Sequence, residues 1–242
     1  MLAIQTIEVV KRYGSVTAVD RLNLEVRQGE LFSLLGVNGA GKTTTIKMLT
    51  GLTRPTEGDA MVCGYSIAKQ PGQIKHLIGV SPQETAVAPN LTVRENLELI
   101  CGVYGFSREK TRAKVEALVK QFSLQPMLER KAGKLSGGWQ RRVSIAMALI
   151  SEPKILFLDE PTLGLDVLAR SDLWDIIRAL KGNVTIILTT HYMEEAEALS
   201  DRIAIMKDGR LLICDTADKI KETAGTDNFE QAFVRIVKGV AK

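Results

Sequence analysis

A glycine-rich loop between a buried strand and a helix limits the possible folds of this chain more than any other feature. Residues 31–35 are nearly all apolar, as expected of a strand covered on both faces of a sheet. Residues 36–43 follow directly with the spacing G-x-x-x-x-G-K-[ST], and residues 44–50 continue as a helix. The backbone N–H groups of such a loop converge on phosphate oxygens, and so does the positive end of the helix. The pattern therefore predicts a phosphate-binding loop in an α/β fold.

Two side chains of this loop carry specific chemistry. Lys42 is expected to bridge the outer phosphates of a nucleotide, and the hydroxyl of Thr43 is expected to bind Mg²⁺. A glycine-rich turn without a ligand is the alternative, and the buried strand in front of the loop argues against it. The nucleotide-binding residues expected here are Gly36, Asn38, Gly39, Gly41, Lys42, Thr43 and Thr44.

Two adjacent carboxylates end a second apolar run. Residues 155–158 are apolar, and Asp159 and Glu160 follow at the strand end, where open α/β sheets bind their ligands. Asp159 is expected to hold Mg²⁺ through its water shell. Because neighbouring side chains on an extended backbone point apart, Glu160 is expected to face a different locus and to deprotonate a water against the γ-phosphate. The alternative is that both carboxylates cap the next helix, and the phosphate loop in the same chain argues against it.

Strand and helix signals alternate along the chain. Short β-type runs occupy the first 83 residues, helical spacing follows over residues 93–119 and 139–150, and strand signals return after Lys154. This alternation predicts an α/β fold with a mostly parallel sheet. The predicted strands are 4–10, 22–26, 31–35, 155–158, 184–188 and 203–206, and further helices are expected over 171–180 and in the tail after Asp215.

Composition narrows the function classes. The 242 residues are 45% hydrophobic and 25% charged, and the net charge of +4 is too small to imply nucleic acid or anionic lipid as a partner. The cysteines Cys63, Cys101 and Cys214 lack metal or redox spacing and are expected to be reduced. His76 is expected on the surface. The N-terminus lacks the layout of a secretory signal, and residues 143–150 are too few to cross a bilayer, so the chain is expected neither to span a membrane nor to be exported.

A second anion-binding helix start carries the most specific signal. Ser136, Gly137 and Gly138 follow Leu135 and open the helical run 139–150. The Leu-Ser-Gly-Gly sequence, together with the phosphate loop and the acidic strand end, resembles the ATP-binding subunit of an ABC transporter. The resemblance covers about residues 4–215.

The resemblance implies a fold and a division of the chain. The expected fold is a P-loop ATPase core, with a mostly parallel sheet, flanking helices and an N-terminal antiparallel β region, plus a helical subdomain. All of residues 1–242 would form one ATP-binding domain. The expected parts are a nucleotide-binding core over 1–85 and 151–215, a helical subdomain over 86–150 and a C-terminal extension over 216–242. The extension would either pack on its own domain or regulate or dimerise the protein.

The resemblance also implies roles for four further residues. Tyr13 matches the aromatic residue that stacks on adenine, and Gln83 matches the glutamine that reaches Mg²⁺ and the attacking water. Asp166 matches the loop that crosses to a second subunit, and His191 matches the histidine that contacts the γ-phosphate. Without the family, these four would be read as a core tyrosine, a loop glutamine, a helix cap and a structural histidine.

One position departs from the family pattern. In the family, the Leu-Ser-Gly-Gly sequence, called the signature below, usually continues with glutamine. This chain has Trp139 at that position, and Gln140 comes one place later. The donors at residues 136–138 are intact, so contact with the γ-phosphate is expected to survive, whereas polar contacts from the fifth position are not assured.

The resemblance implies partners and a mechanism. Similar proteins form a head-to-tail pair, in which residues 136–138 of one chain close over ATP and Mg²⁺ held by the loop of the other. Since the chain shows no obvious arginine finger, the second helix start would supply the missing donors. The expected catalytic residues are Lys42, Glu160 and His191, and hydrolysis by an isolated subunit should be weak.

Separate integral membrane permease subunits would perform the transport, docked on the insert over residues 86–150. The chain would then lie at the cytoplasmic face of the cell membrane. The run 189–197 and the ending near 228–233 look most like those of bacterial or archaeal exporters. The alternative is a soluble ABC-type ATPase that acts on a non-membrane partner. A chromosome-type member is disfavoured because the segment between loop and signature has no sustained heptads.

Overall fold

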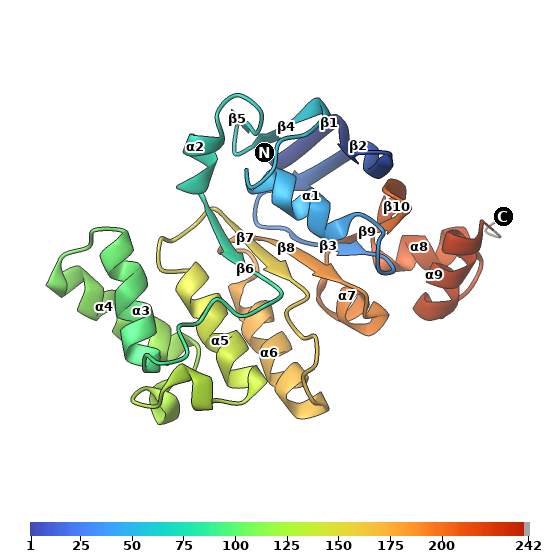
Figure 1. The fold of residues 1–242 in the computed structure, drawn as a ribbon. Coiled ribbons are helices and arrows are strands. Elements are labelled where there is room, and N and C mark those ends of the chain that lie inside the picture. The colour runs from blue at the N-terminus through green and yellow to red at the C-terminus, as the bar shows by residue number, and fades with distance from the viewer. Residues whose placement is uncertain (240–242) are drawn as a thin grey trace.

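The structure is a computed structural model that describes residues 1–239 (Figure 1). Residues 240–242, which belong to the expected C-terminal extension 216–242, lie outside the described residues.

A six-stranded sheet forms the centre of the fold, in the order β10-β9-β3-β8-β7-β6. All neighbouring strands run parallel except β9 and β10, which are joined by a tight turn and run antiparallel. The predicted mostly parallel sheet is therefore confirmed. The strands are β3 (Leu31–Leu35), β6 (Ile78–Ser81), β7 (Ile155–Asp159), β8 (Thr185–Thr190), β9 (Arg202–Lys207) and β10 (Arg210–Asp215).

An antiparallel sheet, in the order β2-β1-β4-β5, covers one side of the molecule. Its first two strands are longer than predicted, because their exposed ends lack the apolar alternation that marks a strand in sequence. These strands are β1 (Leu2–Tyr13), β2 (Val16–Arg27), β4 (Glu57–Val62) and β5 (Tyr65–Ser66). The expected N-terminal antiparallel β region is thus present.

Helices cover both faces of the central sheet. The helix α1 lies between the two sheets, where Ile46 and Leu49 pack with Phe32 and Leu34 of β3 (Figure 1). The helices are α1 (Lys42–Leu49), α2 (Pro71–Lys75), α3 (Val93–Val103), α4 (Arg108–Gln121), α5 (Gly137–Ala148), α6 (Val167–Leu180), α7 (Met193–Leu199), α8 (Ala217–Ala224) and α9 (Phe229–Lys238). Two short 3₁₀ turns span Gln125–Met127 and Ala132–Lys134.

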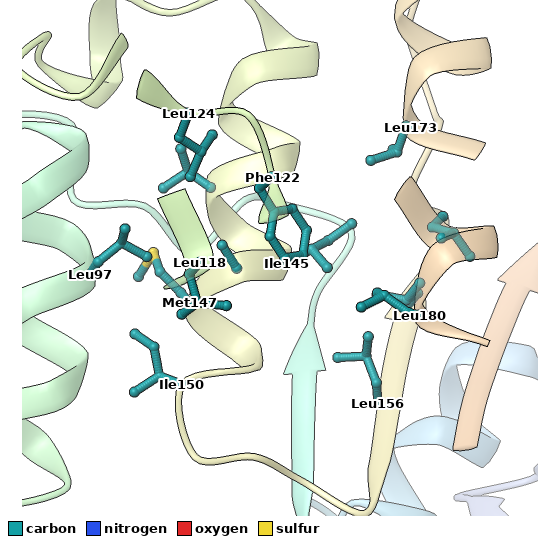
Figure 2. Close-up of a cluster of buried hydrophobic side chains, with 14 of the residues drawn as sticks. Leu97, Leu118, Phe122, Leu124, Ile145, Met147, Ile150, Leu156, Leu173 and Leu180 are labelled. Carbon is teal, nitrogen blue, oxygen red and sulfur yellow. The ribbon is translucent and has the colours of Figure 1, made fainter. Parts of the chain in front are cut away.

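A second hydrophobic core fills the opposite face of the sheet. Figure 2 shows Leu156 of β7 beside Leu180 of α6, and Ile145 of α5 next to Phe122, which follows α4. Because the central strands are covered on both faces, they are apolar along nearly their whole length. This explains why the sequence shows continuous apolar runs there.

The helical segment 93–119 divides into two helices. Thr92 caps α3 in a capping box with Glu95, and Ser107 caps α4. Between them Gly105 takes a left-handed conformation (φ 68°) that reverses the chain. Each helix therefore carries its own start signal.

The C-terminal extension folds back on the core as two helices. Phe229 and Phe233 of α9 pack with Ala196 of α7 and Ile205 of β9, and Lys207 Nζ donates to the carbonyl of Val237 at 2.9 Å. Packing on its own domain, one of the two expected alternatives, is what residues 216–239 show.

Several smaller expectations can be compared directly. His76 is exposed, and the three cysteines are free. Burial raises the pKa of the Cys214 thiol to about 11, which disfavours a reactive thiolate. Within residues 1–239, no helix is both long enough and apolar enough to cross a bilayer.

Candidate functional site

The phosphate loop depends on glycine for steric reasons. A Cβ on Gly36 would lie 2.5 Å from the carbonyl oxygen of Met206, and one on Gly41 would lie 2.5 Å from that of Ala18. Gly41 also has a φ of 98°, which only glycine adopts readily, and it begins α1 without a side-chain cap. The amides of the first helical turn are thus available to an external acceptor.

A cavity of about 650 Å³ opens over this loop. The loop supplies one wall, and residues from five other parts of the chain supply the rest. Its lining residues are Val16, Thr17, Ala18, the loop residues 38–44, Gln83, Glu160, Leu163, His191 and Asp208. The topology therefore gathers most of the sequence-predicted site residues around one space.

Lys42 and Glu160 form a buried ion pair in this cavity. The ammonium of Lys42 lies 3.6 Å from Glu160 Oε1 and donates to the carbonyl of Gly36 at 2.7 Å. Both residues are nearly inaccessible, with 6% of each exposed. A buried charged group lowers stability unless it has a partner, and these two groups are each other's partner.

His191 completes this cluster. Its Nδ1 lies 2.6 Å from Glu160 Oε2, so the histidine at the end of β8 contacts the carboxylate at the end of β7. Because β7 and β8 are parallel neighbours, their carboxyl ends deliver both side chains to the same edge.

Asp159 and Glu160 face different partners, as expected, but for a different reason. Glu160 lies in the left-handed region with a φ of 49°, so the extended backbone assumed from the sequence is wrong at this residue. The turn directs Glu160 to Lys42 and His191, whereas Asp159 accepts a long hydrogen bond from Thr43 Oγ1 at 3.5 Å. Strained residues of this kind cluster at functional sites. The helix-cap alternative is also wrong for this pair, since Asp166 caps the next helix.

Thr189 holds the two carboxylate residues together. Its hydroxyl donates to Asp159 Oδ1 and accepts from the backbone N–H of Glu160 at 3.1 Å. No role for Thr189 was predicted from the sequence. The available signal was a pair of threonines ending an otherwise apolar strand, but its partner depends on the β7–β8 register, in which Asp159 pairs with Thr189.

The oxygen atoms at this edge suit a magnesium ion. The hydroxyl of Thr43 and the carboxylate of Asp159 are within 3.5 Å of one another, and Gln83 lines the same cavity. Mg²⁺ prefers hard oxygen donors and is usually held by one or two protein groups plus water and phosphate. The donor set therefore fits this ion.

Arg141 ties Gln83 to the signature helix. Its two Nη atoms donate to the carbonyls of Pro82 and Gln83, each at 2.5 Å, and the residue is 4% exposed. Burial lowers the pKa of Arg141. The hydroxyls of Ser81 and Ser144 meet at 2.9 Å one turn further along. The segment that carries Gln83 and helix α5 are thus joined directly. The resemblance implied that Gln83 joins the core to the helical insert, but no role for Arg141 was predicted from the sequence.

The signature residues lie outside the cavity. Ser136 precedes α5 in the N-cap position, but its side chain makes no cap hydrogen bond, and both Ser136 and Gly137 are exposed. Gln140 turns back and donates to the carbonyls of Ala132 and Leu135, at 3.2 Å each. Trp139 is half-buried against the core, under the guanidinium of Arg142 at 4.7 Å. The fifth signature position therefore contributes packing here.

Tyr13 and Asp166 are also outside the lining residues. Tyr13 ends β1 and is 49% exposed, so the core-tyrosine alternative is wrong. The lining residues Val16 to Ala18 follow within a few positions. Asp166 accepts from the N–H of Ala169 at 2.9 Å and caps α6. This is the helix cap that its residue type alone predicts.

Comparisons with known proteins agree with this geometry. The ABC transporter family matches residues 19–163. The chain is 40% identical to the daunorubicin resistance ATP-binding protein DrrA2 of Streptomyces coeruleorubidus, over 99% of this chain and 77% of that protein. It is 44% identical to the Nod factor export ATP-binding protein I of Burkholderia orbicola, over 84% of this chain and 67% of that protein.

Solved structures give the same answer at the level of the fold. The ATP-binding subunit of an ABC transporter superposes with a TM-score of 0.85 and 29% identity, over 97% of this chain and 99% of that one. A dimeric ATP-binding cassette in a post-hydrolysis state with ADP and Pi superposes with a TM-score of 0.79 and 28% identity, over 88% and 98% of the two chains. The chain therefore belongs to the ABC transporter family and has the fold of its ATP-binding subunits.

Proposed function

We propose that this protein is the ATP-hydrolysing subunit of an ABC-type membrane exporter, and that it works as a head-to-tail pair. Two similar proteins are named for drug resistance and for Nod factor export, and a similar cassette has been solved as a dimer with hydrolysis products. These relatives support an exporter and a paired ATPase.

The separation of two site halves within one chain carries the proposal. Lys42, Glu160 and His191 meet in the cavity, whereas Ser136 and Gly137 are exposed, and neither they nor Gly138 belong to the described residues that line it. The Ser136 hydroxyl also makes no cap bond in its own chain. Phosphoryl transfer needs donors around the transferred group, so a second copy would bring residues 136–138 to the triphosphate.

The chain's own residues would divide the work as follows. Lys42 and the loop amides bind the phosphates, and Glu160 orients a water and takes its proton. His191 holds the Glu160 carboxylate through Nδ1 and contacts the γ-phosphate. Closure of the pair excludes bulk water and strengthens these interactions.

A bound magnesium ion would be held by Thr43, Asp159 and Gln83. When bound, it would neutralise negative charge on the phosphate oxygens. We further assign Tyr13 to stacking on the adenine, and Asp166 to the contact with the second copy.

Integral membrane permease subunits are the proposed partners, which places the protein at the cytoplasmic face of the membrane. The insert over residues 86–150 carries three exposed apolar side chains on one helix and its end: Leu99 (48% exposed), Val103 (74%) and Tyr104 (41%). Grouped exposed apolar residues mark interaction surfaces, which supports docking on this insert.

A mixing experiment tests the composite site. Lys42→Ala removes the phosphate contact and leaves the signature intact, whereas Ser136→Glu leaves the phosphate loop intact and sets a negative charge against the γ-phosphate. Each variant alone should be inactive. In an equal mixture, half of the pairs combine both variants and hold one intact site, so about a quarter of the wild-type turnover should return. No recovery would contradict the head-to-tail pair.

A reconstitution experiment tests the exporter. The protein is assembled in proteoliposomes with the membrane protein encoded beside it, and ATP hydrolysis is compared with and without that protein. Stimulation together with ATP-dependent efflux is expected. If no membrane protein stimulates hydrolysis and a soluble partner does, the alternative of a soluble ABC-type ATPase replaces this proposal.

A further inference from the structure

Besides Glu160, a second glutamate, Glu195, is completely buried near the carboxyl ends of β7 and β8. It belongs to α7, which follows His191, and none of its surface is exposed. A buried carboxylate lowers stability unless hydrogen bonds compensate it, so its presence requires an explanation. The mechanism described above does not use it.

Three segments that carry the proposed catalytic machinery converge on this carboxylate. Its Oε1 accepts from Trp174 Nε1 of α6 at 3.1 Å. The hydroxyls of Thr162 and Thr190 lie beside it and hold its pKa down, against the stronger effect of burial, which raises that pKa. Thr162 comes two residues after Glu160, and Thr190 comes directly before His191.

The Glu195 carboxyl group lies among unpartnered polar atoms and near other charged groups. The second oxygen, Oε2, and the buried hydroxyl of Thr162 have no partner with full hydrogen-bond geometry. The negative charge of Glu160 raises the pKa of Glu195 further, while the buried guanidinium of Arg141 also feels the field of Glu195. The carboxyl group of Glu195 is therefore close enough to both the Glu160 carboxylate and the Arg141 guanidinium to interact with them electrostatically.

We propose that Glu195 is a positioning residue for ATP hydrolysis, which holds the turn after Glu160, the start of the His191 turn and helix α6 in one fixed arrangement. This inference rests on the proposed function. Glu195 contacts neither nucleotide nor water in it and acts through Thr162, Thr190 and Trp174.

The physical reason is the left-handed turn at Glu160. That turn stays in a strained conformation only when its surroundings hold it there, and its N–H is fixed by Thr189 from one side. Behind the same turn, the buried Thr162 hydroxyl lies beside the Glu195 carboxylate, which accepts from Trp174 Nε1 of α6 at 3.1 Å. Without this carboxylate, Glu160 and His191 would lose their mutual alignment, while the phosphate loop, which Glu195 does not touch, would be unchanged.

The test compares three variants of the full chain. Glu195→Leu removes the acceptors at similar volume, and Glu195→Gln keeps an acceptor for Trp174. Glu30→Leu is the matched control, because Glu30 is also a buried carboxylate (7% exposed) with hydrogen bonds, from the Arg27 N–H and Arg202, but it lies before the opposite end of β3. Four quantities are measured for each variant: the turnover number, the KM for ATP, the midpoint of thermal unfolding and the amide exchange of residues 163–169.

For Glu195→Leu, kcat should fall about 10- to 100-fold with KM for ATP nearly unchanged, because misplacement by about 1 Å has effects of this size. Its amides 163–169 should exchange faster. Glu195→Gln should stay within about 3-fold of the wild type, a rescue by the hydrogen bond to Trp174. Glu30→Leu should lower the unfolding midpoint without changing kcat or exchange in that loop.

The inference is overturned if Glu195→Leu keeps wild-type kcat, or if Glu30→Leu loses kcat to the same extent, which would make the effect one of general stability. Failure of the proposed function is a separate result, since the wild-type protein would then fail to hydrolyse ATP at all.

Discussion

The two halves of the proposed ATP site differ in how far a single chain completes them. At the carboxyl edge of the sheet, Lys42 and His191 both already contact Glu160 inside a cavity. At the start of α5, Ser136 and Gly137 are exposed, and the hydroxyl of Ser136 is not used to cap its helix.

The difference follows from electrostatics. Charged groups that leave water must have partners in the same chain, or the fold loses stability. Neutral donors on an exposed helix start remain hydrated without penalty, and they become strong only when another surface removes that water. The contacts of the first half are therefore visible in one chain, whereas the second half would take up its proposed role only on contact with a second copy.

Arg141 connects these two halves. It belongs to the signature helix and holds the backbone of Pro82 and Gln83. This contact joins the backbone of Gln83, which lines the cavity, directly to the helix that begins with the exposed residues.

The largest effect is expected on the buried side, from Glu160→Gln. The change keeps the shape and removes the base, so kcat should fall about 10²- to 10⁴-fold. Closure should survive, and the variant should accumulate as a pair at saturating MgATP, as measured by light scattering. A variant that stays monomeric there would show that Glu160 is not the base of a site closed by a second copy.

On the exposed side, Ser136→Ala should lower kcat about 100-fold, as loss of one preorganised donor does. Because Ser136 does not cap its helix, the thermal midpoint should be unchanged. Ser107→Ala is the contrasting control: Ser107 caps α4, so its loss should lower stability and leave kcat intact. If the two substitutions lowered stability equally, the Ser136 hydroxyl would be a structural cap and not a free donor for a second copy.

The support behind the acidic pair should matter less than the pair itself. Thr189→Val deletes the hydroxyl that joins Asp159 to the Glu160 N–H, and should lower kcat about 10-fold. It should also lower the free energy of unfolding by about 1–3 kcal/mol, because the buried Asp159 carboxylate loses the hydroxyl that donates to it. Thr185→Val on the same strand, where the hydroxyl accepts from Gly29, should show the stability loss without the kinetic one.

The smallest effect concerns the pH dependence of stability. Burial raises the pKa of Glu195 above its ordinary value of 4.5, so the folded protein binds this proton more tightly than the unfolded chain. The free energy of unfolding must then fall as pH rises from about 4.5 through the folded-state pKa. Glu195→Gln should lack this contribution, and urea titrations of both proteins across that range would reveal the difference. Identical pH profiles would mean that the Glu195 carboxyl has no raised pKa in the fold.

Much of the architecture could be read from local patterns. The apolar run 31–35 coincides with β3, and the run 155–158 lies within β7, because a strand buried on both faces needs apolar residues throughout. The glycines of the phosphate loop were equally visible, since only glycine fits where a Cβ would meet the backbone of another segment. The division into a core and a helical subdomain stays a prediction.

The candidate site was predicted in part. Lys42, Glu160 and His191 were each identified, but their direct contacts were not, because they come from segments more than 30 residues apart. Residues 136–138 were identified as an anion-binding helix start, and Tyr13 and Asp166 by resemblance. Their proposed contacts are with a nucleotide or a second copy, so a single chain without nucleotide does not display them.

The sequence by itself determined which segments bind phosphate and which strands are buried, since these properties depend on residue type and spacing. Only the tertiary structure decided that Thr189 joins the acidic pair, that Arg141 holds Gln83 and that Glu195 lies behind Glu160. These contacts depend on the register between parallel strands and on the packing of α5, α6 and α7, and a change of one residue in either would have brought different side chains together.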